Sequence, residues 1–484
     1  MSFLSPGYLL FFPATVLLYF LLPRPCKNLW LLAASWFFYL CAGPDCFAFL
    51  LCATLVTYTG ARLLERRDGA SRKALLTLLL TLLFGTLFLF KYLDFAFSLA
   101  ERVLDAAGLS FSSPALDLIL PAGISFYLFM AAGYLIDVYR GDRAAERSFL
   151  LCALFLSFFP HVISGPIARA GGLIPQFREV RRFDYDKFRA GLLRFLWGAF
   201  KKLCIADRLA VLVNAVFAAP GDFGWLQVIA AACAFSVQIY CDFSAYSDMA
   251  LGSAEAMGFH LMENFRTPYF SRSIGEFWRR WHISLSSWFR DYLYIPLGGS
   301  RRGRVRTYAN LLIVFAVSGL WHGSALAFVA WGLLNGLYQV IGGLTADLRT
   351  RVRGRLGLTE DGRLTVLLQV GITFLLSTVA WVFFKGGSFT HALFIFQNMF
   401  TGPWLTHPVT AWGLDRPELV VAFFAILLLL AVDLASLRVD LWTGFLRLPR
   451  PLRWALALSL TLAVLICGIY GTGYDPQDFI YFKF

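Results

Sequence analysis

The sequence predicts an all-α protein embedded in a membrane, with roughly 10–13 transmembrane or re-entrant helices in a single membrane domain over residues 1–484. Two observations predict this class. Of the 484 residues, 58% are hydrophobic and only 15% are charged, which is too apolar for a water-soluble protein of this length. Eight apolar runs also approach or reach the roughly 20 residues that a helix needs to cross a bilayer. They cover residues 7–22, 29–41, 47–64, 74–90, 116–138, 364–384, 419–432 and 454–470.

The composition and the missing motifs speak against nucleic-acid binding, a metal cofactor and a nucleotide-driven pump. The net charge is +13 at pH 7, but the basic residues lie between apolar runs, where they orient helices and meet the anionic lipid bilayer rather than nucleic acid. The nine cysteines are scattered through apolar segments, so we expect inert buried thiols. The sequence has no H-x-x-x-H pair and no phosphate-binding glycine loop. We therefore expect no metal cofactor and no nucleotide-driven pump.

The basic loops predict the orientation of the first helices. Arg24 and Lys27 follow the first run, and a basic loop at 62–73 follows the third. Such loops face the cytoplasm, so the N-terminus is predicted on the outer side. The first run has no basic leader and no cleavage site, and we interpret it as a retained span.

The apolar stretch at 149–167 breaks the alternation of sides. It contains Pro160, Gly165 and Pro166, and basic residues flank it at both ends. Both flanks are therefore predicted on the same side, with the stretch entering and leaving the membrane by one face. Backbone without regular secondary structure is tolerated inside a membrane only where it is buried in protein or lines a cavity. This pattern predicts a cavity that opens to the cytoplasm.

The segment at 188–219 is predicted to be a helix, but it carries five charged side chains: Arg194, Lys201, Lys202, Asp207 and Arg208. Charged side chains that face lipid are costly. We therefore expect this helix to be tilted or partly interfacial.

His322 is the strongest candidate among six histidines. The apolar runs at 308–320 and 325–341 have basic flanks, which predicts a hairpin whose turn, "SGLWHGSA", lies deep in the membrane. An ionisable residue at that depth marks a functional cavity by default, although a structural role is the alternative. Gly319 and Gly323 allow close backbone approach there. A neutral imidazole at this position can accept a proton from a hydroxyl.

His282 lies in the unusual stretch "EFWRRWHISLSSWFRDYLYIPLGG". Trp278, His282 and Ser286 have i, i+4 spacing, which predicts one shared helical face, and Arg279 and Arg290 follow it less closely. The alternative is an interfacial helix with an aromatic belt and snorkelling arginines. The remaining histidines, in outer loops or apolar surroundings, are predicted to be structural.

Two long motifs resemble the core signature of the membrane-bound O-acyltransferase family. They are "NFRTPYFSRSIGEFWRRWHISLSSWFRDYLYIPLGGSRRG" (264–303) and "NLLIVFAVSGLWHGSALAFVAWGLLNG" (310–336). Further matches are "LPAGISFYLFMAAGYLIDVYRG" (120–141), "SGPIAR" (164–169) and "QIYCDFSAYSDMALG" (238–252). Within the family, the motifs most resemble the branch of alginate O-acetyltransferase membrane subunits, and the resemblance extends from the first span to about residue 343.

The resemblance implies a fold and two site residues. The family fold is a ring of tilted helices around a central funnel, here with N-terminal helices at 1–115, a catalytic core at 116–345 and C-terminal helices at 346–484 that are expected to contact a partner. The histidine of "LWHG", here His322, is the family's catalytic base. The histidine of "RWHIS", here His282, is a second polar residue of the same reaction chamber.

The resemblance also implies the substrates and partners. Acetyl-coenzyme A, the acyl donor, would enter from the cytoplasm, and Arg279, Arg280, Arg301 and Arg302 are the candidates to bind its phosphates. The acceptor would be a hydroxyl of an extracytoplasmic, cell-surface polysaccharide, reached through a partner of the SGNH-hydrolase type. The expected location is the bacterial cytoplasmic membrane.

Three alternatives remain open. Within the same family, D-alanyl transfer to teichoic acid and O-acetylation of peptidoglycan use the same fold. A transporter or flippase would also have broken helices and polar residues at the membrane midplane. The sequence shows no internal repeat with matched broken helices, which speaks against a transporter.

Overall fold

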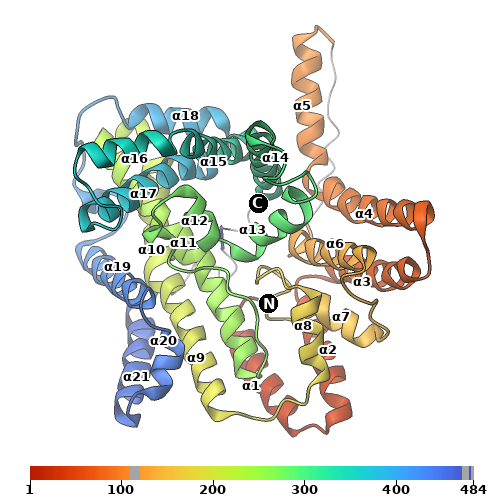
Figure 1. Ribbon diagram of the computed structural model, residues 1–484. Helices are drawn as coiled ribbons and strands as arrows, with labels where there is room; N and C mark the ends of the chain where they lie inside the picture. The colour runs from red at the N-terminus through yellow and green to blue at the C-terminus, as the bar shows by residue number, and fades with distance from the viewer. Residues whose placement is uncertain (110–119, 471–478, 481–484) are drawn as a thin grey trace. The chain divides into compact units, whose positions relative to one another are not determined.

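The computed structural model describes residues 1–109, 120–470 and 479–480, and every regular element within them is a helix (Figure 1). The predicted all-α class is therefore confirmed. The start of the run predicted at 116–138 lies outside the described residues. The chain divides into two compact units, one made of Met1–Leu192 with Ala250–Met262 and the other of Leu193–Met249 with Glu263–Phe484. We call them the first and the second unit.

Helices α1 to α4 of the first unit begin a few residues before the apolar runs predicted at 7–22, 29–41, 47–64 and 74–90. Prolines stand in the first turns of α1, α2 and α3, a position where the missing N–H costs nothing. The helices are α1 (Pro6–Leu21), α2 (Arg24–Leu40), α3 (Pro44–Glu65), α4 (Gly69–Lys91), α5 (Leu93–Ala106), α6 (Ile124–Arg140), α7 (Phe149–Ser157), α8 (Ala170–Arg178) and the start of α9 (Tyr185–Phe200).

The break predicted at 149–167 is confirmed. Helix α7 ends at Ser157, and the chain has no helix again until α8 begins at Ala170. The side chains between them are almost all buried, as irregular backbone in an apolar protein requires. Gly123, with φ 73°, lies directly against this segment, and a Cβ there would be 2.4 Å from the carbonyl oxygen of Val162. The entry and exit of this segment by one face stays a prediction.

Glu146, in the loop before α7, connects this loop to α8. It binds the guanidinium of Arg178, and its carboxylate accepts the N–H of Ser148. Burial raises the pKa of Glu146, but the hydrogen bonds from Ser148 and Arg178 outweigh this effect and leave the pKa below its ordinary value. The loop is therefore anchored by a charged carboxylate.

The second unit holds most of the later helices. Helices α9 and α10 are continuous, because a π-helical turn at Lys201–Ala206 joins them without a break. The helices are the end of α9, α10 (Asp207–Ala218), α11 (Trp225–Ala256), α12 (Ile274–Arg280), α13 (Ile283–Phe289), α14 (Arg304–His322), α15 (Leu326–Leu344), α16 (Ala346–Arg355), α17 (Arg363–Lys385), α18 (Phe389–Asn398), α19 (Arg416–Ser436), α20 (Leu441–Arg447) and α21 (Arg450–Cys467).

Seven described helices are long and apolar enough to cross a membrane. They are α3, α4, α11, α15, α17, α19 and α21, and α1 is a shorter apolar helix. The chain is thus a multi-pass membrane protein, as its composition predicts.

Helices α14 and α15 form the predicted hairpin and lie side by side (Figure 1). A Cβ on Gly319 would lie 2.3 Å from the carbonyl oxygen of Phe328, and one on Gly332 would lie 2.2 Å from that of Phe315. Only glycine permits such close contact between two helix backbones. The glycines therefore fix the pairing of the hairpin, and with it the position of the turn after His322.

Candidate functional site

His322 is the last residue of α14, and only 3% of its surface is exposed. Aromatic rings from three helices surround the imidazole. The ring centroids of Trp321 and Trp331 each lie 4.9 Å from that of His322, and the centroid of Phe384, on α17, lies 5.4 Å away. All three rings meet it edge to face. These rings give the imidazole apolar surroundings.

His282 does not lie within a helix, so the predicted shared face of Trp278, His282 and Ser286 is wrong. Helix α12 ends at Arg280 and α13 begins at Ile283, and His282 stands between them with φ 44° and ψ 53°. This left-handed conformation is costly for a side chain other than glycine. The predicted face of Arg279 with Arg290 is lost for the same reason.

The physical cause of the break lies in another part of the chain. The backbone N–H of Ile283 donates to the carbonyl oxygen of Asn264 at 3.0 Å, and the N–H of Arg266 donates to that of Arg280 at 2.9 Å. These bonds replace the helical pairing that would have joined α12 to α13. The extended loop at 264–266 thus redirects the chain at His282.

The two predicted histidines come together in the second unit. Their ring centroids are 6.4 Å apart, and Trp321 lies 5.8 Å from His282. His282 is 1% exposed, so both imidazoles are buried. Two imidazoles at this separation can contact one small group, such as a hydroxyl or a thioester, from two sides. Proton transfer by a positioned imidazole is the chemistry that this pair supports best.

The tryptophans of the same stretch do not form an aromatic belt, which overturns the interfacial alternative. Trp281 is fully buried and Trp278 is 8% exposed. Trp281 packs against Trp381 at 4.9 Å, and Trp278 against Trp331 at 5.6 Å. The indole N–H of Trp278 also donates to Asn335 at 3.2 Å. Trp331 also contacts His322, so these indoles belong to the apolar surroundings of the site.

The four arginines predicted to bind the donor lie on both sides of the His282 segment. Arg279 and Arg280 form the last turn of α12, and Arg280 pairs with Glu276 at 2.6 Å. Arg301 and Arg302 are exposed in the turn before α14. Phosphate binding by these side chains stays a prediction. The described residues contain no group of three or more His, Cys, Asp or Glu side chains that could hold a metal ion.

The charges on α9 and on the π-helical turn after it are buried in ion pairs, and the predicted tilted or partly interfacial position of this helix stays a prediction. Arg194 donates to Asp248 at 2.9 Å and to Glu263 at 2.7 Å. Lys201 donates to the other oxygen of Asp248 at 2.6 Å and to Ser244 at 2.6 Å. Buried charges are tolerated when they are paired in this way.

A second group of ion pairs surrounds Lys202, the residue after Lys201. Lys202 contacts Asp242 at 2.7 Å and Asp207 at 2.8 Å. Asp242 also accepts the backbone N–H of Ile480, near the end of the chain, at 2.7 Å. The sequence identifies Lys202 and Asp207 only as charges of one helix and does not reveal their partner Asp242. The signal that could have found them is the adjacent Lys201–Lys202 pair together with two aspartates six residues apart, at 242 and 248.

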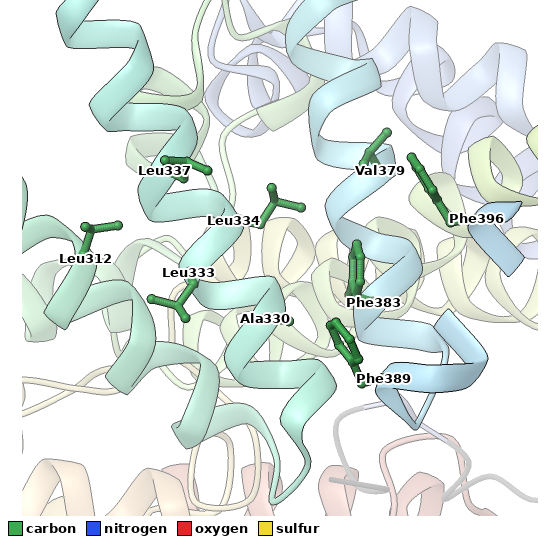
Figure 2. Close-up of a pocket in the computed structure, with 9 residues that line it drawn as sticks. All are labelled: Leu312, Ala330, Leu333, Leu334, Leu337, Val379, Phe383, Phe389 and Phe396. Atoms are coloured by element: carbon green, nitrogen blue, oxygen red, sulfur yellow. The ribbon is translucent and has the colours of Figure 1, made fainter. Parts of the chain in front are cut away.

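An apolar groove of about 550 Å³ lies elsewhere in the second unit. Figure 2 shows it between α15 and α17, with residues of α14 and α18 at its sides. Its lining is entirely apolar: Leu312, Ala330, Leu333, Leu334, Leu337, Val379, Phe383, Phe389 and Phe396. This lining has no side chain that could bind a charged nucleotide, and neither histidine belongs to it. It is therefore distinct from the candidate site.

Comparison with known proteins shows which proteins this chain is similar to. The family model for MBOAT, the membrane-bound O-acyltransferase family, matches residues 143–386, a range that contains both histidines. The "Probable alginate O-acetylase AlgI" of Pseudomonas putida is 39% identical over 432 residues, which cover 86% of this chain and 84% of the relative.

More distant relatives carry other names. The "Peptidoglycan O-acetyltransferase" of Helicobacter pylori is 33% identical, with 80% of this chain and 77% of the relative covered. The "Teichoic acid D-alanyltransferase" of Streptococcus thermophilus is 28% identical, with 54% of this chain and 68% of the relative covered. All three names describe transfer of an acyl group.

Proposed function

Because the chain belongs to the membrane-bound O-acyltransferase family, we propose that it transfers acetyl groups from cytoplasmic acetyl-coenzyme A to hydroxyls of an extracytoplasmic polysaccharide. The relatives named as alginate O-acetylases support acetyl as the acyl group. The observation that carries the proposal is the pair of buried imidazoles, 6.4 Å apart, of His282 and His322.

In the proposed reaction His322 is the general base. The acceptor oxygen attacks the carbonyl carbon of the thioester while His322 accepts the hydroxyl proton. The new C–O bond forms and the C–S bond breaks. The proton then passes to the thiolate of coenzyme A, which leaves as a thiol, and the imidazole returns to its neutral state. The apolar rings around His322 favour that neutral state, because burial disfavours charge.

The donor would be bound through its phosphates. Arg301 and Arg302 are exposed, so they are available to an anionic nucleotide. Arg279 is also exposed, whereas Arg280 pairs with Glu276. These arginines would hold the nucleotide at the cytoplasmic mouth of the site while the pantetheine arm carries the thioester to the histidines.

The acceptor side requires a partner. We propose that an extracytoplasmic protein of the SGNH-hydrolase type receives the acetyl group and passes it to the polymer, and that the C-terminal helices at 346–484 contact this partner. Only the acyl group then crosses the membrane, and coenzyme A stays in the cytoplasm.

The peptidoglycan O-acetyltransferase relative supports a second candidate acceptor. The chemistry at His322 is the same for both polymers. Incubation of membranes with labelled acetyl-coenzyme A, followed by separation of exopolysaccharide from peptidoglycan, distinguishes the two acceptors. Label in peptidoglycan alone would replace the first candidate by the second.

The first prediction tests the base. In purified protein, His322→Ala should reduce acetyl transfer from acetyl-coenzyme A by about 1000-fold or more, because the general base is lost. The measurement is single-turnover transfer of radiolabelled acetyl groups to an added acceptor.

The matched control is His391→Ala, since His391 lies on α18 and its imidazole contacts the carbonyl oxygen of Phe217 at 2.8 Å. This control should keep the wild-type rate. Wild-type activity in His322→Ala would refute the assignment of His322 as the general base. Counterflow of an intact solute without acetyl transfer would favour a transporter.

A further inference from the structure

Asn264 makes more contacts to the His282 segment than its position in an extended loop suggests. It is buried, with 1% of its surface exposed. Its carbonyl oxygen accepts the N–H of Ile283 at 3.0 Å, and its side chain reaches the next N–H, that of Ser284, at 3.1 Å. One residue thus holds both N–H groups that follow His282.

These contacts fix which way the Asn264 amide points. The backbone N–H of Ser284 can only donate, so the side-chain atom that it meets must be the oxygen, Oδ1. The nitrogen, Nδ2, then donates to the hydroxyl of Ser247 at 3.3 Å. The N–H of Ser284 thus sets the orientation of the amide, and the hydroxyl of Ser247, which can donate or accept, is compatible with it.

The orientation of the amide in turn fixes the proton on His282. Nδ1 of His282 lies 3.4 Å from the same Oδ1 atom. Because Oδ1 can only accept, Nδ1 must carry the proton, and the lone pair of the neutral imidazole is on Nε2. Phe243 packs edge to face against the ring at 4.6 Å, which keeps it in this orientation.

We propose that Asn264 is a positioning residue that holds His282 in the Nδ1–H tautomer, so that Nε2 meets the substrate as a hydrogen-bond acceptor. This inference rests on the proposed acetyl transfer for its functional meaning. His282 then orients a second N–H or O–H donor of the bound substrates, because the one proton of the attacking hydroxyl goes to His322. In its neutral state Nε2 has no proton to give to the thioester oxygen.

The backbone supports a positioning role. His282 and Thr267 are the two non-glycine residues with positive φ in the part of the chain that the structure describes, and both lie in or beside the segment that Asn264 organises. A left-handed histidine persists only where its surroundings impose that conformation. The two bonds from Asn264 to the residues after His282 supply such a constraint.

The experiment reads the tautomer directly. Full-length protein with ¹⁵N-labelled histidine, in lipid nanodiscs, is examined by solid-state NMR, and the His282 signals are assigned by their loss in His282→Ala. In the wild type we expect a protonated Nδ1 and an unprotonated Nε2 at His282. Asn264→Ala should remove this preference and reduce kcat for acetyl transfer by about 100-fold, with little change in KM for acetyl-coenzyme A.

Two further variants separate positioning from folding. Asn264→Asp keeps an acceptor oxygen at Oδ1, so it should keep the tautomer and a rate within about 10-fold of the wild type. Asn310→Ala is the control, because Asn310 is also fully buried in the second unit but donates to the carbonyl oxygen of Gly299. It should leave the His282 signals unchanged.

The outcomes distinguish the two proposals. A protonated Nε2 at His282 in the wild type, or an unchanged tautomer and rate in Asn264→Ala, would overturn the role of Asn264. Absence of acetyl transfer in the wild type would refute the proposed function, and the tautomer measurement would still decide the placement of the proton. If Asn264→Ala fails to fold, the protonation of the His282 nitrogens in the wild-type and Asn264→Asp spectra decides whether the proposed role of Asn264 holds.

Discussion

The two histidines of the site are held by different means. His322 ends a regular helix, and its hairpin is fixed by backbone contact at Gly319 and Gly332 and by the rings around the imidazole. His282 stands at a break between two short helices in a left-handed conformation, held by hydrogen bonds from Asn264. Aromatic rings and close helix packing surround one imidazole, and hydrogen bonds across a loop hold the segment of the other.

This difference suggests a division of roles. A base that must accept and release a proton is served by apolar surroundings that favour its neutral state. A residue that orients a hydrogen-bond donor of the substrates needs a defined tautomer, which a directional hydrogen bond sets. The structure provides the first condition at His322 and the second at His282.

The largest effect on stability is expected at the hairpin. Gly332→Ala places a methyl group 2.2 Å from the carbonyl oxygen of Phe315, so α14 and α15 must move apart. We expect a loss of about 3 kcal/mol in the free energy of unfolding, at the upper end of overpacking costs. Thermal unfolding in detergent and acetyl transfer should both show the loss.

Gly342→Ala is the control on the same helix, because nothing lies within 4 Å of the added carbon. Alanine forms helix better than glycine, so stability should stay the same or rise by up to about 1 kcal/mol. Equal destabilisation by the two variants would show that backbone contact does not fix the hairpin.

A smaller effect is expected at the break. His282→Gly and His282→Ala both remove the imidazole, but glycine accepts a φ of 44° without strain. We expect His282→Gly to be more stable than His282→Ala by about 1 kcal/mol. Both should lose acetyl transfer to a similar extent. A more stable alanine variant would mean that the left-handed conformation is not retained.

The sequence was sufficient to predict the hairpin and the broken stretch at 149–167. In both cases the signal is local, since glycines, prolines and apolar runs act on the chain where they stand. The position of His322 at the end of α14 follows from the same local pattern. The family motifs added the pairing of His322 with His282, which local pattern alone could not have supplied.

The break at His282 could not be predicted in this way. Spacing alone favours one helix through Trp278 and Ser286, and the cause of the break is Asn264, which is distant in sequence. The buried ion pairs of Arg194 and Lys201 were missed for a similar reason, because their partner, Asp248, lies on another helix. Tertiary contacts decide such features, and a single sequence does not display them.

The most direct test of a single shared site is a double-mutant cycle of acetyl transfer with His322→Ala, His282→Ala and the combined variant. Single-turnover transfer of radiolabelled acetyl groups measures the residual rates, which substrate binding alone sustains. If both imidazoles act in the same reaction step, the combined variant should lose no more than His322→Ala alone. A loss equal to the product of the two single losses would contradict a shared site.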